Sequence, residues 1–348
     1  MGALLRRRLA WMLPSFLGIT LVVFLAVHLA PGDPAPAAGL DPSANGPDAA
    51  EIERWRAEHL LDRPLWVQYL HFLGPFDLSP RGHAWFGGSG EHAFGGLLAL
   101  DLGSELGRPH VRIADELGRR LAVTLPLSAC AGLLAWGLAI PLGVWSAVRR
   151  GTKRERALAL VLFGLHSLPG FWLGLLLVLG FGAAGLSWLP VLGLHSAGAA
   201  ELSWFERALD LARHALLPVL TLALASLAYL ARQVRASMLE VLGQEYVLTA
   251  RAKGLPERRV LLRHVLRNAL LPVITLAALL LPALVSGSVI VESIFGLPGM
   301  GRYAYEALLE RDYPVIQAVT ALSALVTLFA LLCADLAYAW ADPRIRHE

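Results

Sequence analysis

The chain has 348 residues, of which 56% are hydrophobic and only 16% are charged, and its mean hydropathy is +0.57. Soluble domains carry about 25% charged and about 45–50% apolar residues, so this composition excludes an ordinary soluble protein and predicts lipid as the main solvent of the chain. The formal net charge of +3 is small, so the positions of the charges are more informative than their sum.

Six apolar stretches are long enough to cross a membrane, because a hydrocarbon core of about 30 Å needs about 20 mostly apolar residues in a helix. A helix bundle satisfies every backbone group internally, so we expect an all-α polytopic membrane protein. Pro169 and Gly170 predict a kink in the third span. The six expected spans are Leu9–Leu29, Leu121–Val148, Ala157–Phe181, His214–Ala231, Ala269–Val291 and Tyr313–Trp340.

The first span follows three arginines, Arg6–Arg8, as the apolar core of a signal peptide does. Its apolar run is longer than an ordinary signal core, and the following "VHLAPGDP" is a poor cleavage site for a signal peptidase. We therefore expect residues 1–30 to form a cytoplasmic N-terminus and an uncleaved first membrane helix.

The cations predict the orientation of the protein in the membrane. Basic segments precede span one, separate spans two and three, separate spans four and five, and follow span six. With six spans these segments share one side, and positive segments stay in the cytoplasm. Both termini, including the tail 341–348, are therefore expected in the cytoplasm, and the acidic segment 31–118 is expected outside. The remaining five spans occupy 119–340, with a cytoplasmic loop at about 237–268.

The expected external segment contains an amphipathic stretch from Pro47 to Leu73, which is interrupted at Pro64. We expect this stretch to cap the helix bundle. The glycine-rich sequence "WFGGSGEHAFGG" lacks the Gly-Lys-Ser/Thr ending of a phosphate-binding loop, so it predicts a flexible external loop.

A basic block, "EYVLTARAKGLPERRVLLRHVLRN", runs from Glu245 to Asn268 between two apolar stretches. The pattern predicts one helix from Ser237 to Lys253, which Gly254 ends, and Pro256 suits the first position of the next helix. Met238, Val241, Leu242, Tyr246 and Thr249 recur at helical spacing in the first helix, and Val260, Leu261, His264, Val265 and Ala269 share one side of the second.

Two interpretations of this block compete. In the first interpretation, the block is a positive loop whose only role is to fix the topology or to attract acidic lipid headgroups. Neither of these roles requires a glycine bend or an apolar stripe, so a docking site for a cytoplasmic partner explains more of the pattern.

The sequence "EYVLTARAKGLPERRVLLRHVLRNALLPVIT" closely resembles the cytoplasmic signature of ABC-importer permeases in the dipeptide, oligopeptide and nickel branch. Three further landmarks agree in order along the chain: "APGDP", "ESIFGLPGMGRYAYEALLERDYPVIQA" and "ADPRIR". The resemblance therefore extends from Pro31 to Arg346.

The resemblance implies that the glycine-centred loop is a coupling helix, which seats in a groove on an ATP-binding subunit. Small residues would let the partner's backbone approach closely, and the arginines would pair with its acidic groups. Leu248 and Thr249 depart from the general family signature, although the threonine resembles the peptide branch. The matching coupling residues are Glu245, Tyr246, Thr249, Ala250, Arg251, Ala252, Lys253 and Gly254.

The resemblance also implies the protein's function and partners. The chain would form half of a translocation pathway for di- or oligopeptides in the bacterial inner membrane, paired with a second homologous permease subunit as a heterodimer. Two cytoplasmic ATP-binding subunits would bind the ATP and magnesium, an extracytoplasmic solute-binding protein would deliver the substrate, and membrane lipid would surround the spans. No cofactor in this chain and no nucleic acid partner are expected.

Other functions stay open at this point. A permease of the same family could carry nickel or another small solute, although the sequence contains no cluster of His, Cys and Met residues. An integral-membrane enzyme would use ionisable residues in or near the spans, but no catalytic motif accompanies them. These ionisable residues are His28, His166, Asp335 and Asp342. A channel or scaffold without energy coupling would need no docking loop, and Cys130 and Cys333 are expected to be packing residues.

Overall fold

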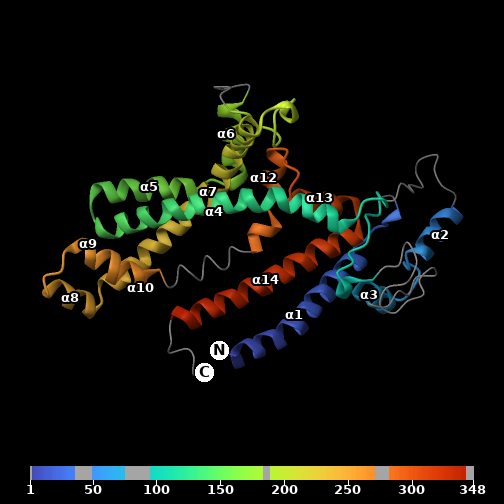
Figure 1. The fold of residues 1–348 in the computed structure, drawn as a ribbon, viewed down its shortest axis with the longest axis horizontal. Helices are drawn as coiled ribbons and strands as arrows, with labels where there is room; N and C mark the ends of the chain where they lie inside the picture. The colour runs from blue at the N-terminus through green and yellow to red at the C-terminus, as the bar shows by residue number, and fades with distance from the viewer. Residues whose placement is uncertain (1, 36–48, 75–94, 183–188, 271–281, 342–348) are drawn as a thin grey trace. The chain divides into compact units, whose positions relative to one another are not determined.

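The computed structural model describes residues 2–35, 49–74, 95–182, 189–270 and 282–341 (Figure 1). The elements in these ranges are helices, with one isolated β-bridge between Ser104 and Arg112. The chain divides into two compact units, which are described separately. Unit 1 contains Met1–Ala122 and Met300–Leu328, and unit 2 contains Val123–Gly299 and Phe329–Glu348.

Unit 1 is built around the first helix and parts of two long helices that continue into unit 2. Its elements are α1 (Gly2–Leu29), α2 (Ala49–Glu58), α3 (Leu65–Leu73), the short 3-10 helix η2 (Leu97–Ala99), the start of α4 (Ile113–Val148), α13 (Met300–Glu310) and most of α14 (Tyr313–Ala341). One core cluster joins Ile113 and Leu117 of α4 to Met300 and Tyr303 of α13. The amphipathic stretch from Pro47 divides into α2 and α3 on either side of Pro64, so the predicted interruption is confirmed.

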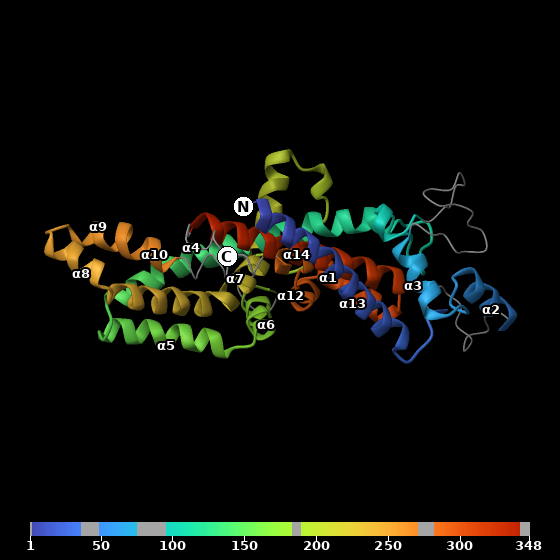
Figure 2. The ribbon, with the colours of Figure 1, turned by 90° about the horizontal axis from the view of Figure 1, so that it is seen from below.

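Unit 2 holds the remaining helices. They are the rest of α4, α5 (Lys153–Ser167), α6 (Gly170–Phe181), η3 (Ala199–Glu201), α7 (Trp204–Leu242), α8 (Glu245–Ala252), α9 (Glu257–Arg259), η4 (Val260–Leu266), α10 (Arg267–Ala269) and α12 (Val289–Ile294). Helix α5 lies alongside α7 (Figures 1 and 2). Small residues such as Ala135 and Ala139 of α4 pack against Ala223 and Ala231 of α7, which is typical of helices that associate in lipid.

Four helices in the described ranges are long and apolar enough to cross a membrane, within Arg6–Leu29, Ile113–Val148, Trp204–Leu242 and Tyr313–Cys333. Helices α5 and α6 reach that length only as a pair, and the chain bends by 97° between them. The break falls at Leu168 and Pro169, so the predicted kink is confirmed as a sharp break. The expected span Ala269–Val291 includes residues 271–281, which lie outside the described ranges.

Helix α7 begins at Trp204, before the expected fourth span, which starts at His214. Ser203 forms a capping box with Glu206, whose carboxylate accepts the Ser203 N–H (3.0 Å). Charged residues interrupt the apolar pattern in these first turns, so hydropathy alone overlooked the start. Helix α4 likewise begins at Ile113 rather than Leu121, and so before the expected boundary at residue 119. Acidic residues in its first turn suit the positive end of the helix dipole.

Candidate functional site

The basic block leaves the end of α7 through a turn at Gly243. The prediction of one helix from Ser237 to Lys253 is wrong, because α7 ends at Leu242 and α8 starts afresh at Glu245. The Gly243 N–H donates to the carbonyl O of Glu240 (3.3 Å), and Gln244 is extended. The glycine interrupts a sequence that is otherwise compatible with a helix.

The restart at Gln244 changes which side of α8 is buried. The sequence analysis assumed that the helix continues through Gly243, and on that assumption Tyr246 and Thr249 belong to the apolar stripe. In the structure both side chains are exposed. Val247 is fully buried instead, and Ala250 is 7% exposed. Gly243 and Gln244 are not helical, so α8 buries a different side from the one that an uninterrupted helix would bury. The predicted stripe assumed an uninterrupted helix.

The bend after α8 has the hydrogen-bond pattern of a Schellman motif. Gly254 has a φ of +75°, a conformation that residues with a side chain disfavour. Its N–H donates to the carbonyl O of Arg251 (2.9 Å), and the Leu255 N–H donates to the carbonyl O of Ala250 (3.4 Å). The prediction that Gly254 ends the first helix is therefore confirmed.

A second helical run, from Glu257 to Ala269, follows the bend. Pro256 has φ −60° and ψ 137° and is the N-cap of this helix, so the helix begins at Glu257, one residue after the predicted start at Pro256. The middle of the run, Val260–Leu266, is a π-helix, which the sequence did not predict. Local π-helical turns occur frequently at functional sites.

The two helices of the block share a core with the ends of the long helices of unit 2. We call this cluster the loop core. Each fully buried valine in it contributes about 1.5–3 kcal/mol relative to an exposed one. The loop is therefore held in a defined conformation by its own packing. The loop core consists of Ala147, Val234, Met238, Val247, Ala250, Val260, Val265 and Ala269.

Two polar contacts brace the bend from the outside. The Arg251 guanidinium donates to both carboxylate oxygens of Glu257, with Nη2–Oε1 at 2.7 Å and Nε–Oε2 at 3.2 Å. This hydrogen bond holds the pKa of Glu257 below its usual range and raises the pKa of Arg251. The Asn268 side-chain amide donates to the Tyr246 hydroxyl (2.8 Å) and so connects α8 to α10. Arg251 is therefore paired within the loop.

An ion pair with a buried carboxylate anchors the neighbouring turn between α4 and α5. Glu155 is the only acid among five nearby cations from Arg149 to Arg156, yet its side chain is buried. Arg235 of α7 approaches Glu155 with Nη2–Oε1 at 3.0 Å, one turn before the loop-core residue Met238. Sequence reasoning missed this contact, although a lone acid in a basic turn is the signal that could have indicated it.

Seven of the eight predicted coupling residues lie on the exposed side of the block. They are Glu245, Tyr246, Thr249, Arg251, Ala252, Lys253 and Gly254. Ala250 is the exception, because its side chain is 7% exposed and packs into the loop core. Two leucines of the block that were not among the predicted coupling residues are also exposed, Leu248 (57%) and Leu262 (51%).

Together, the long apolar helices and this packed helix–bend–helix block define a helical membrane protein with one preformed basic surface. The profile of the family described as binding-protein-dependent transport system inner membrane component matches residues 139–347. The chain belongs to this family of membrane permease subunits, which are not enzymes themselves. The family resemblance inferred from the sequence is confirmed.

Three curated relatives match the chain over nearly its whole length. The dipeptide transport system permease protein DppB of Escherichia coli K12 is 36% identical over 98% of each chain. The oligopeptide transport system permease protein AppB of Bacillus subtilis 168 is 37% identical over all of both chains. The di/tripeptide transport system permease protein DppB of Pseudomonas aeruginosa UCBPP-PA14 is 34% identical, also over all of both chains.

A solved structure shares the fold at low sequence identity. It is a chain of the MetNI methionine ABC transporter in an inward-facing conformation, with a TM-score of 0.50 and 20% identity. The match covers 65% of this chain and 96% of that chain. It confirms a helical membrane permease fold.

Proposed function

We propose that the chain is the membrane subunit of an ABC importer and forms half of a translocation pathway for di- or oligopeptides. The substrate class rests on the relatives, which carry dipeptide, oligopeptide or di/tripeptide transport in their names and align along almost the whole chain. The other half of the pathway comes from a second homologous permease subunit, and an extracytoplasmic solute-binding protein delivers the peptide.

One observation carries the energy-coupling part of this proposal. The helix–bend–helix block has its own core, and it exposes seven of the eight residues that match the coupling signature. A preformed surface loses little conformational entropy when a partner binds. In our proposal this surface docks on one of two cytoplasmic ATP-binding subunits, which hold ATP and magnesium, and the chain itself needs no cofactor.

Removal of this subunit should therefore stop peptide uptake. We expect cells that lack the chain to lose uptake of a labelled dipeptide, and re-expression of the chain should restore it, because each half of the pathway is required. Uptake of labelled nickel in the same cells provides the comparison. Loss of nickel uptake with unchanged dipeptide uptake would overturn the proposed substrate class.

The proposed topology has six spans, cytoplasmic termini and residues 31–118 on the external side, because the basic segments then share the cytoplasmic side. Reporter fusions at Gly151 and Gly254 should have cytoplasmic activity, and a fusion at Gly90 should have external activity. Gly151 and Gly254 both lie in exposed turns of unit 2. External activity at Gly254 would be incompatible with docking on a cytoplasmic subunit.

A further inference from the structure

Helix α3 lies beside α1 and contacts it well before the end of α1 at Leu29. The Tyr69 hydroxyl donates to the carbonyl O of Leu17 (3.1 Å) and lies 3.1 Å from the Thr20 hydroxyl. The Tyr69 ring packs against Phe24 with centroids 5.2 Å apart. Leu17 precedes the end of α1 at Leu29 by twelve residues, or about 18 Å of helix.

That distance is more than half of a hydrocarbon core of about 30 Å. Helix α1 is a candidate membrane span from Arg6 to Leu29, and if this helix crosses the membrane, Leu17 and Thr20 lie near the middle of the bilayer. Helix α3 has the sequence LWVQYLHFL, whose buried Gln68 donates to the carbonyl O of Arg63 (2.8 Å). Its composition therefore suits a lipid environment, whichever way the chain is oriented.

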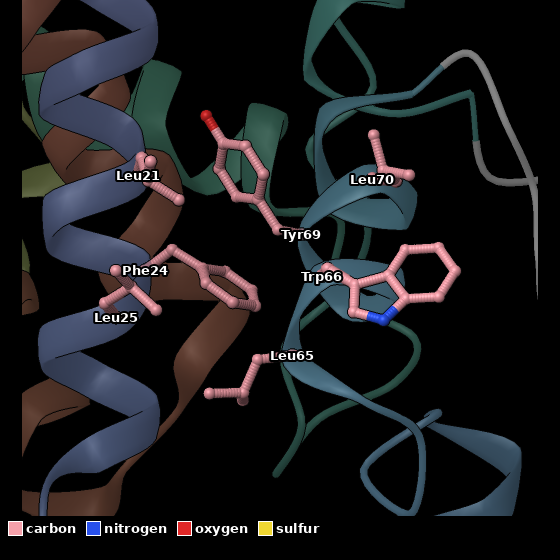
Figure 3. A pocket seen from close by; sticks show the side chains of 7 residues that line it. All are labelled: Leu21, Phe24, Leu25, Leu65, Trp66, Tyr69 and Leu70. Atoms are coloured by element: carbon pink, nitrogen blue, oxygen red, sulfur yellow. The ribbon is translucent and has the colours of Figure 1, made fainter.

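An apolar groove of about 460 Å³ lies between α1 and α3. This volume is within the range of about 300–1,000 Å³ that is typical of small-molecule sites. In Figure 3, the rings of Phe24 and Tyr69 lie next to each other between the helices, in an edge-to-face arrangement, and Trp66 extends from α3 on the side away from α1. The complete lining consists of Leu21, Phe24, Leu25, Leu65, Trp66, Tyr69 and Leu70.

The atoms that line the groove are almost all carbon, so a ligand would make mainly apolar contacts there. The one hydroxyl in its lining, on Tyr69, is already bonded to α1. Trp66 is 66% exposed, and neighbouring residues of α1 such as Val22 are also exposed to the surroundings. These exposed side chains of α1 face lipid if this helix spans the membrane.

We propose that α3 is a re-entrant membrane helix and that the groove binds one acyl chain of a membrane phospholipid. A transmembrane helix of a partner would fit the groove poorly, because helices in lipid associate through small residues and this lining contains only Leu, Phe, Trp and Tyr. A flexible acyl chain follows such an uneven apolar surface. Helix α3 begins at Leu65, which lies on the same side of the groove as Leu25 of α1. The polar residues Asp62 and Arg63 come just before this end of α3, so in this proposal they lie near the lipid headgroups.

Photolabelling tests the occupant. The full-length chain is reconstituted in nanodiscs of phosphatidylcholine and phosphatidylglycerol that carry a diazirine in the middle of one acyl chain. After illumination, mass spectrometry should find lipid attached to peptides that contain Trp66 and Leu70. Leu25→Trp should fill the groove and reduce this labelling severalfold. Val22→Trp adds the same ring to an exposed position of α1 outside the groove, so it should leave the labelling unchanged.

A second measurement tests the depth of α3 without requiring a filled groove. Leu70→Cys and Asp62→Cys are compared in a background in which Cys130 and Cys333 are replaced by alanine. A membrane-impermeant maleimide should label Cys at position 62 and leave position 70 unlabelled until the membrane is dissolved. Equal labelling at both positions would place α3 in water and overturn the proposal. Equal photolabelling in wild type and Leu25→Trp, or cross-links from this surface to a protein helix, would exclude the acyl chain as the occupant.

Discussion

Gly254→Val should abolish peptide uptake while the protein reaches the membrane in normal amounts. Gly254 has a φ of +75°, and left-handed backbone costs a residue with a side chain about 1–2 kcal/mol, with β-branched residues least tolerant. A β-carbon built at this position meets no atom within 4 Å. The effect must therefore come through the backbone, which would shift the second helical run relative to α8 and so disturb the proposed docking surface.

Two matched variants separate backbone conformation from the simple loss of a glycine. Asparagine tolerates the left-handed region, so Gly254→Asn should keep a large share of the uptake that Gly254→Val loses. Gly243→Ala changes a glycine of the same block whose φ is −82°, and its new β-carbon would make only ordinary contacts. It should transport normally.

Membrane immunoblots, copurification of the ATP-binding subunit and dipeptide uptake should be measured on the same cells. A Gly254→Val protein that inserts, binds its ATP-binding subunit and transports at the wild-type rate would show that the coupling assignment is wrong. Equal losses in Gly254→Val and Gly254→Asn would show that the partner needs the bare glycine surface.

The sequence predicted those parts of the site that depend on single residues with strong local preferences. Gly254 ends α8 because only glycine takes that conformation easily, and Pro169 breaks the pair α5–α6 because it has no N–H to donate. Gly243 was overlooked because a single glycine is tolerated inside a helix, and its φ of −82° is one that any residue can adopt. The helix start at Ser203 did have a signal, the capping box with Glu206, but the apolar pattern outweighed it.

Contacts between distant segments could not be predicted in the same way. The pair Glu155–Arg235 joins residues eighty positions apart, and neither periodicity nor composition specifies that distance. The burial of Ala250 could not be predicted either. Ala250 matches the family signature, but its side chain is buried because α8 starts again at Glu245 and does not continue the helical turns of α7. A signature identifies the positions that a family shares, and only packing shows which of them reach a partner.

Val247→Asp should disrupt the fold of the basic block and Leu248→Asp should leave it intact, although the residues are adjacent. Val247 is fully buried in the loop core, and a carboxylate there would lie among apolar side chains at a cost of several kcal/mol. We expect Val247→Asp to loosen the block, so that limited proteolysis cleaves near Arg251 or Lys253 much faster than in wild type. Both docking and uptake should then be lost.

Leu248 is 57% exposed, so an aspartate at this position stays in water and the block should resist proteolysis as wild type does. If Leu248 contacts the ATP-binding subunit, its charge would enter an apolar contact, and copurification and uptake should both fall while the fold is kept. Leu248→Met, which keeps the apolar character, should restore both. Wild-type docking and uptake by Leu248→Asp would remove this residue from the proposed interface, because an unpaired carboxylate is not tolerated at the centre of an apolar contact without a loss of affinity.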